Sequence, residues 1–312
     1  MINLDNLKSQ INEVNFDIKN KYNSVFTIDS NNFKNKLKTE IGELIKLKKI
    51  DNENIIRYNS LVGVDGSNNR SGGAFPHFIE IVQGLAKSTN GNEVFNSTVY
   101  TPALSQTVDD GNLSQKLLAS IEIETALEYI DKYELKYLMM DGGFIRYKIH
   151  CLELFKKLRQ ICEKKGIILF GVIKDIKTNL IASKLDLDKT IYDREILFNR
   201  LEIGEAILIN NEINKKFLEN GDGFSSAFMR TSNFPGAIGV DILDTQQTHL
   251  KEICNLIYTL TPINSRGVPL WLDIVDKDVK ITDEIIETLL EEFLDRDIYE
   301  RFFISERDKR TL

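Results

Sequence analysis

The chain has 312 residues, 42% hydrophobic and 28% charged, a composition typical of a globular protein that can bury a sizeable core. It has no run of about 18 apolar residues and no basic N-terminal segment followed by an apolar stretch, so the sequence predicts neither a membrane span nor a secretion signal. The formal net charge of −7 argues against binding nucleic acid by bulk positive charge, although Phe144 to Lys184 carries ten basic residues against three acidic ones.

Cysteine usage indicates a reducing compartment. Cys151, Cys162 and Cys254 cannot form a disulfide framework, and their spacing fits no zinc pattern. The three histidines are scattered along the chain, so a structural zinc is not expected either. We therefore expect a cytoplasmic protein with three buried thiols.

The N-terminal 50 residues are predicted to be helical. Phe33, Leu37, Ile41 and Leu44 recur at helical intervals in a segment rich in lysine. We interpret residues 1–50 as a helical arm that packs on a partner subunit, and residues 51–312 as the main domain.

Three strands follow this arm. The apolar run that ends at Asp65 predicts the first strand, and the stretch from Gly66 to Gly73, rich in glycine and asparagine, predicts a turn. Phe78 to Leu85 and Glu93 to Tyr100 predict the second and third strands.

Helices and strands then alternate. The expected elements are a helix from about Leu113 to Asp131, a strand from Tyr137 to Met140, a basic helix from about Tyr147 to Lys164 and an apolar strand from Ile167 to Ile173. A meander of three strands followed by this alternation predicts an α/β fold with a ribonuclease-H-like mixed sheet flanked by helices.

The rest of the chain is predicted to be mostly helical, forming a C-terminal addition. The expected elements are helices from about Asp193 to Ile209, from about Thr248 to Leu260 and from about Thr282 onward, and a strand pair near Phe228–Thr231 and Ala237–Ile242.

Two aspartates end apolar strands in the same way. Asp65 and Asp141 each follow a short apolar run, and each is followed by a glycine that allows a sharp turn. Ligands of open α/β sheets bind beyond the carboxyl ends of strands, so the pair predicts a shared acidic site. For either residue alone, a simple turn-starting role stays open.

Further acids lie on the long helix and in a late apolar stretch. Glu122, Glu124 and Glu128 are candidates on the helix, and they are surface residues if that face is solvated. Asp273 and Asp276 interrupt the late apolar stretch, where a lone buried carboxylate is costly unless it pairs with a cation. We favour Asp276, with Asp273 in reserve.

Carboxylates gathered at one edge of a sheet suit metal chemistry. They repel each other and raise each other's pKa, and Mg²⁺ or Mn²⁺ relieves that repulsion. Two such ions about 4 Å apart activate a water and stabilise the leaving oxygen of a phosphodiester. Lys174, directly after an apolar strand, is a candidate to bind the scissile phosphate, and Phe144 and Tyr147 are candidates to stack on bases.

Several of these segments, in order and spacing, resemble the NurA nuclease family. They are Val62 to Ser67, the helix with Glu124, Met139 to Ile145, Gly171 to Lys174 and Pro269 to Asp276. The ordered set, which extends over about residues 55 to 300, is more specific than any single segment.

The resemblance implies a nuclease that depends on Mn²⁺ or Mg²⁺, with two ions bound. Such proteins cut single-stranded DNA, degrade DNA ends with 5′-to-3′ polarity, form dimers and work with the hexameric ATPase HerA. The family's site residues map to Asp65, Glu124, Asp141, Lys174 and Asp276. Two departures are Asp276, where the family often has His, and Gly143, where it commonly has Ser or Thr.

Two other classes of protein remain as alternatives. Actin-like or sugar-kinase-like ATPases also begin with a strand and Asp-Gly and carry a later Asp-Gly-Gly, but this chain lacks a third glycine after Gly143 and a duplicated half. A non-catalytic NurA-like subunit that clamps DNA or an ATPase is the other class, although the presence of all four candidate acids argues against it.

Overall fold

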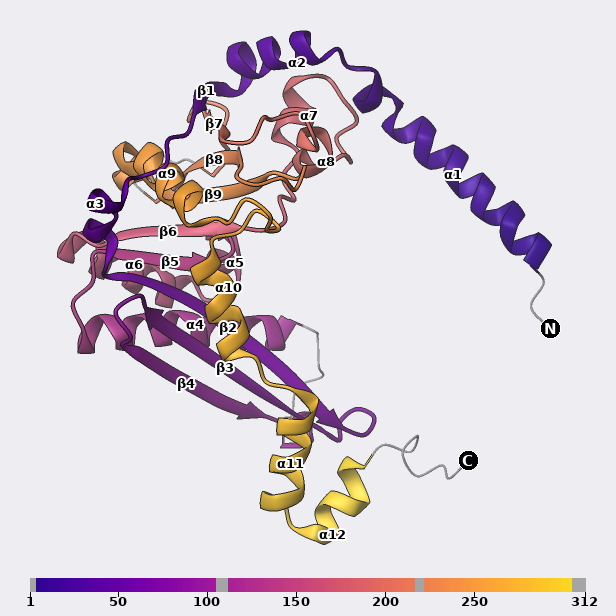
Figure 1. The fold of residues 1–312 in the computed structure, drawn as a ribbon. Helices are drawn as coiled ribbons and strands as arrows, with labels where there is room; N and C mark the ends of the chain where they lie inside the picture. Colours follow the sequence, from indigo (N-terminus) through magenta and orange to yellow (C-terminus); the bar gives the residue numbers. More distant parts are fainter. Residues whose placement is uncertain (1–3, 105–111, 217–221, 305–312) are drawn as a thin grey trace.

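The computed structural model describes residues 4–104, 112–216 and 222–304, and within these ranges the strands form one nine-stranded sheet. The strands are β1 Gly42–Lys46, β2 Leu61–Gly72, β3 Phe78–Ser88, β4 Glu93–Tyr100, β5 Tyr137–Asp141, β6 Ile168–Ile173, β7 Glu205–Ile209, β8 Phe224–Arg230 and β9 Ile238–Leu243. Their order across the sheet is β1-β7-β8-β9-β6-β5-β2-β3-β4 (Figure 1).

The sheet joins a parallel centre to antiparallel flanks. β5 pairs in parallel with both β2 and β6, whereas β2, β3 and β4 form an antiparallel meander. The order β4-β3-β2-β5-β6 is that of a ribonuclease-H-like core, so the predicted fold class is confirmed. Beyond β6, strands β9, β8, β7 and β1 extend the sheet in antiparallel fashion.

Helices cover both faces of the sheet. The α-helices of the described residues are α1 Leu4–Thr27, α2 Ser30–Lys36, α3 Asn52–Ile55, α4 Asn112–Lys132, α5 Ile145–His150, α6 Leu152–Lys165, α7 Leu180–Lys184, α8 Asp193–Leu197, α9 Leu250–Leu260, α10 Leu270–Val279, α11 Asp283–Phe293 and α12 Arg296–Ile298. Successive side chains of a strand point to opposite faces, so Val62 and Val64 of β2 pack with α4 while Leu61 packs with α9 and α10.

Helix α10 crosses β2 at close range (Figure 1). A Cβ at Gly63 would lie 3.0 Å from Cγ2 of Val275 and 3.2 Å from Cδ1 of Trp271, so glycine permits this approach. The indole N–H of Trp271 donates to the carbonyl of Lys87 at 3.1 Å, which fixes the helix against β3. The late apolar stretch is therefore a helix held over the sheet.

The N-terminal segment departs in part from the predicted helical arm. Helix α1 projects away from the body, as Figure 1 shows, and helical turns continue to Ile41. The segment then becomes β1, which pairs with β7 because Gly42 allows close contact: a Cβ there would lie 1.9 Å from the carbonyl oxygen of Leu208. The expected boundary at residue 50 thus falls after a strand of the main sheet.

Three local predictions are wrong. The stretch from Gly66 to Gly73 is not a turn, because pairing with β3 continues β2 as far as Gly72. The helix expected over Asp193 to Ile209 is the short α8, which ends at Leu197. Left-handed backbone at Asn199 and Gly204 then leads into β7. The basic helix is interrupted at Cys151, whose φ of −150° and ψ of 52° separate α5 from α6.

The other predicted elements are present. β8 and β9 form the expected late strand pair, and α9 and α11 lie where helices are predicted. The three cysteines are free and buried, as expected. Among the described helices, none combines the length and the apolar character that crossing a bilayer requires.

Candidate metal centre

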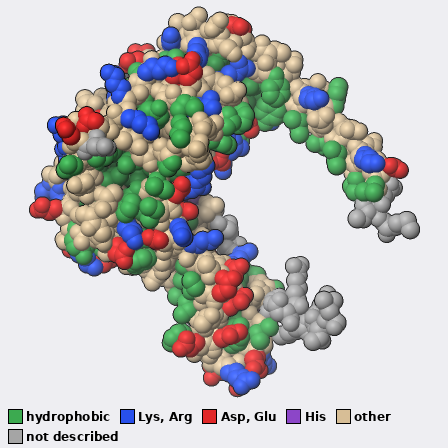
Figure 2. All heavy atoms as spheres, in the orientation of Figure 1, with side chains coloured by type: hydrophobic (Ala, Val, Ile, Leu, Met, Phe, Trp, Pro, Cys, Tyr) green, Lys and Arg blue, Asp and Glu red, His purple; other side chains and the backbone are tan. Residues whose placement is uncertain are grey.

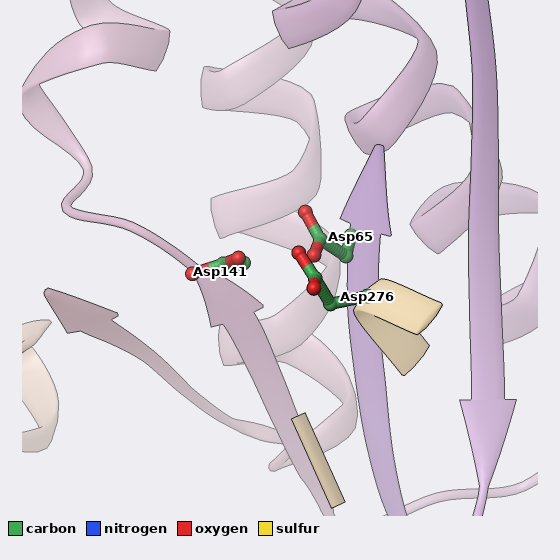
Figure 3. A group of neighbouring side chains, drawn as sticks. All are labelled: Asp65, Asp141 and Asp276. Atoms are coloured by element: carbon green, nitrogen blue, oxygen red, sulfur yellow. The ribbon is translucent and has the colours of Figure 1, made fainter. Parts of the chain in front are cut away.

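Three of the predicted acids meet at the centre of the sheet. Ligand oxygens of Asp65, Asp141 and Asp276 lie within 4.8 Å of one another. Figure 3 shows Asp65 on β2, Asp141 at the tip of β5, and Asp276 reaching the same space from α10. Residues far apart in the sequence are thus gathered by folding, as the sequence predicts for these three.

Strand register explains the pairing of the first two aspartates. In the parallel ladder of β2 and β5, Val64 is opposite Met140, so Asp65 and Asp141 follow at the same level where the pairing ends. The two aspartates therefore lie side by side, and their side chains point to the face of the sheet that α10 covers. The shared layout of strand, Asp and Gly seen in the sequence is therefore a consequence of adjacent parallel strands.

Helix α10 decides between the two late aspartates. Asp276 belongs to the acidic group, whereas Asp273, one helical turn earlier, is held by Arg266, with 2.5 Å between Nη2 and Oδ1. Asp273 already has a cationic partner and is directed to another neighbour. The choice of Asp276 over Asp273 therefore agrees with the geometry.

Lys174 follows β6, the next parallel strand, and contacts the same acids. Its Nζ lies 2.5 Å from Oδ2 of Asp141 and 3.7 Å from Oδ1 of Asp276. Burial by itself lowers the pKa of Lys174, but the charge of Asp141 and its hydrogen bond outweigh this effect and raise it. The ammonium is thus a permanent charge beside the acids.

The prediction of Glu124 as the helix acid is wrong in placement. Glu124 is exposed on α4, whereas Glu122 is only 1% exposed, and neither glutamate is one of the three converging carboxylates. Two residues on a helix point about 200° apart, so only one of them can face the sheet. A Cβ at Gly66 would lie 2.8 Å from Oε1 of Glu122, which places that carboxylate next to Asp65.

A buried cation holds Glu122 in position. Arg146 of α5 forms an ion pair with Oε2 of Glu122 and donates to the backbone carbonyl of Asp141 at 3.0 Å. The hydroxyl of Tyr147 donates to the same Oε2 at 2.6 Å. Neither Arg146 nor Tyr147 was singled out as a positioning residue from the sequence, because their partners lie about 25 residues away.

The donor atoms fit a divalent cation. Oδ2 of Asp65 and Oε1 of Glu122 are buried and have no hydrogen-bond partner within the described part of the chain. An unpaired buried carboxylate oxygen is costly, and a hard cation satisfies it. The donor set consists of carboxylates alone, which suits Mg²⁺ or Mn²⁺ better than a soft metal.

Electrostatics within the group point the same way. Burial, the charge of Asp141 and the hydrogen bond with Asp141 together raise the pKa of Asp65 to about 9. Burial also raises the pKa of Glu122, despite the opposing effects of Arg146 and Tyr147. The site therefore resists holding all its negative charges at once unless a cation enters.

Phe144 and Tyr147 cannot stack on nucleic-acid bases, contrary to the interpretation from sequence. Both side chains are fully buried, and their rings pack against Phe155 with centroids 5.5 and 5.8 Å apart. The sequence shows aromatic residues near a predicted site, but only the packing decides which rings face solvent.

The raised pKa of Asp65 predicts how the stability of the metal-free protein depends on pH. Its ordinary value of 3.8 applies to the unfolded chain, so the folded protein holds this proton more tightly and loses that stabilisation as the pH rises from about 4 to about 9. In EDTA, Asp65→Asn should show a smaller fall in free energy of unfolding between pH 6 and pH 9, measured by urea denaturation.

Adding Mn²⁺ at high pH provides the complementary measurement. The wild type should be stabilised because the carboxylate binds the cation, whereas Asp65→Asn should gain much less. Identical pH slopes in EDTA, or equal stabilisation of both proteins by Mn²⁺, would contradict this assignment of Asp65.

Comparisons with known proteins agree with this architecture. A model of the NurA domain matches residues 59–281, and no curated protein matches the chain. The NurA nuclease from Sulfolobus solfataricus is similar with a TM-score of 0.60 and 16% identity, covering 94% of this chain and 96% of that one. A structure of NurA bound to dAMP and manganese is similar with a TM-score of 0.54 and 11% identity, covering 96% and 100%.

At 16% and 11% sequence identity, these two structures show that the fold is shared. The domain match is broader evidence, because it extends from just before β2 to the end of α10 and includes Asp65, Asp141 and Asp276. The chain belongs to the NurA family.

Proposed function

We propose that this chain is a metal-dependent deoxyribonuclease that hydrolyses phosphodiester bonds with two bound Mn²⁺ or Mg²⁺ ions. The observation that carries the proposal is the convergence of Asp65, Asp141 and Asp276 beside Lys174 on adjacent parallel strands and one crossing helix. The similar structures support it, since one is named a nuclease and another is a NurA bound to dAMP and manganese.

Each residue has a separate task in this proposal. Asp65, Asp141 and Asp276, with Glu122 beside them, would hold the cations, and Arg146 keeps Glu122 in place. Bound divalent ions supply an activated water and neutralise charge on the phosphodiester. Lys174, once released from Asp141, donates to a non-bridging phosphate oxygen and orients the scissile group.

The loop after Asp141 disfavours the ATPase alternative. The backbone N–H of Gly142 donates to the carbonyl of Val172 at 2.8 Å, so it is not free to bind a phosphate. A Cβ at Gly143 would lie 3.0 Å from both Oδ2 of Asp241 and Cδ1 of Ile173. These glycines serve close packing against β6 and β9 and do not form an open phosphate loop.

The proposed assembly is a homodimer in the cytoplasm that processes DNA ends with a HerA-type ATPase. Helix α1 supports the dimer, because its apolar residues alternate at intervals of three and four, the spacing of a coiled-coil seam. These exposed residues are Leu4, Leu7, Ile11, Val14 and Ile18. The ATPase partner and the two activities of this chain, single-strand endonuclease and 5′-to-3′ exonuclease, are proposed from family resemblance.

Cleavage of end-labelled single-stranded and duplex DNA tests the acid assignments. The wild type should cleave with Mn²⁺ or Mg²⁺ and not with EDTA. Asp141→Asn and Glu122→Gln should lower the rate on the order of 100-fold or more, because each removes an anionic metal ligand. Glu124→Gln is the matched control on the same helix and should retain full activity.

Circular dichroism and thermal unfolding should show that the variants remain folded. Wild-type rates in both Asp141→Asn and Glu122→Gln would reject the nuclease site, and a loss confined to Glu124→Gln would restore the assignment made from sequence.

Lys174→Ala tests the proposed phosphate contact. Removal of one preorganised electrostatic donor should cost about 2 kcal/mol, which is roughly a 30-fold loss in kcat/KM. Lys251→Ala, at an exposed position of α9, serves as the control and should leave kcat/KM unchanged. Equal values for Lys174→Ala and wild type would reduce Lys174 to a structural counter-ion of Asp141.

A further inference from the structure

An open cavity adjoins the acidic group on the side of Lys174. It has a volume of about 460 Å³, and residues of α1, α8 and the loops after β6 and β8 line it. Lys174 lines this cavity, and its Nζ contacts Asp141, so the same residue belongs to the cavity wall and to the surroundings of the proposed metal centre.

Three exposed phenylalanines make part of the cavity lining aromatic and apolar. Phe26, Phe198 and Phe234 line it with exposed fractions of 70%, 53% and 48%. Figure 2 shows hydrophobic side chains gathered where the N-terminal arm joins the body. Large apolar rings left in water at one place mark a binding surface more often than chance exposure.

Two of these rings are set in a defined geometry. Phe198 and Phe234 lie with centroids 6.4 Å apart at an interplanar angle of 87°, so they form two walls of a corner. A Cβ at Gly236 would lie 2.3 Å from Cε1 of Phe234, so glycine is needed for that ring to lie where it does. One ring can stack on a flat ligand while the other contacts its edge.

The polar groups around the cavity are already paired with each other. Arg194 forms an ion pair with Asp175, and the hydroxyl of Tyr22 donates to Glu195 at 3.1 Å. With these donors and acceptors engaged, the cavity offers flat apolar contact and little hydrogen-bond discrimination. Such a surface accepts any nucleobase, since every base has an aromatic face.

We propose that Phe198 and Phe234, with Phe26 at the rim, form a stacking site for an unpaired base next to the phosphate at the acidic group. This inference rests on the proposed function. Lys174 provides the continuity, because it lines the cavity and its ammonium is the group proposed to bind the phosphate. A paired base is stacked inside its duplex, so only an unpaired or extruded base enters.

Binding in EDTA tests this proposal without cleavage. Two fluorescent probes of equal charge are compared by anisotropy: a twelve-residue oligothymidylate and a twelve-residue abasic sugar-phosphate chain. Phe198→Ala and Phe234→Ala should each weaken binding of the oligothymidylate by about 5- to 160-fold, the range of one lost base–aromatic stack. Neither substitution should alter binding of the abasic chain by more than about twofold.

Phe95→Ala is the matched control. Phe95 is 47% exposed on β4 at the far edge of the sheet, so its removal should change neither affinity. Circular dichroism and light scattering verify fold and oligomeric state. Unchanged oligothymidylate binding in both cavity variants, or equal weakening with the abasic chain, would overturn the proposal, as would an altered oligomeric state with intact DNA binding.

The outcome is separable from that of the nuclease proposal. A protein that binds oligothymidylate through these rings but never cleaves DNA keeps the stacking site and loses the proposed activity. If the wild type cleaves DNA and the Phe198→Ala and Phe234→Ala variants bind oligothymidylate as tightly as the wild type, the nuclease activity stands and the stacking site is rejected.

Discussion

Repulsion between carboxylates that the sheet holds together is the constraint on which this site depends. The parallel register of β2 and β5 leaves Asp65 and Asp141 no freedom to separate, and α10 adds Asp276 from above. Burial removes the water that would otherwise screen these charges, and the pKa of Asp65 rises to about 9 as a result. Lys174 offsets part of the repulsion, and the unpaired oxygens of Asp65 and Glu122 leave the remainder for a cation.

Much of the surrounding packing serves to hold these charges in place. Gly63 lets α10 approach β2, and Gly66 leaves room for Glu122 beside Asp65. Arg146 of α5 contacts both the carboxylate of Glu122 and the backbone carbonyl of Asp141, so it fixes these two residues relative to each other. A larger side chain at either glycine would move a carboxylate, which links local backbone packing to the chemistry proposed for the centre.

The positions of the strand-end residues can be predicted from the sequence because their signal is local. An apolar run that ends in Asp-Gly defines Asp65 and Asp141, and Lys174 follows the same kind of run. Glu122 was open to prediction as well, since Ala119, Glu122, Ala126 and Tyr129 share one helical stripe, and a carboxylate within it is the exception. The family resemblance indicates Glu124, which lies outside that stripe. The pairing of β1 with β7 could not be predicted, because the two strands lie about 160 residues apart in the sequence and their pairing overrides local helical patterns.

The central proposal is that the converging carboxylates Asp65, Asp141 and Asp276, with the buried Glu122 next to Asp65, form one cation site. Anomalous diffraction from crystals grown with Mn²⁺ tests it most directly. The account predicts a strong peak bonded to oxygens of Asp65 and Asp141, at roughly the 2.0–2.6 Å typical of hard cations with oxygen ligands. A protein that is saturated with Mn²⁺ in solution but shows no peak at these residues, or shows it only at Asp273 or Glu124, would contradict the account.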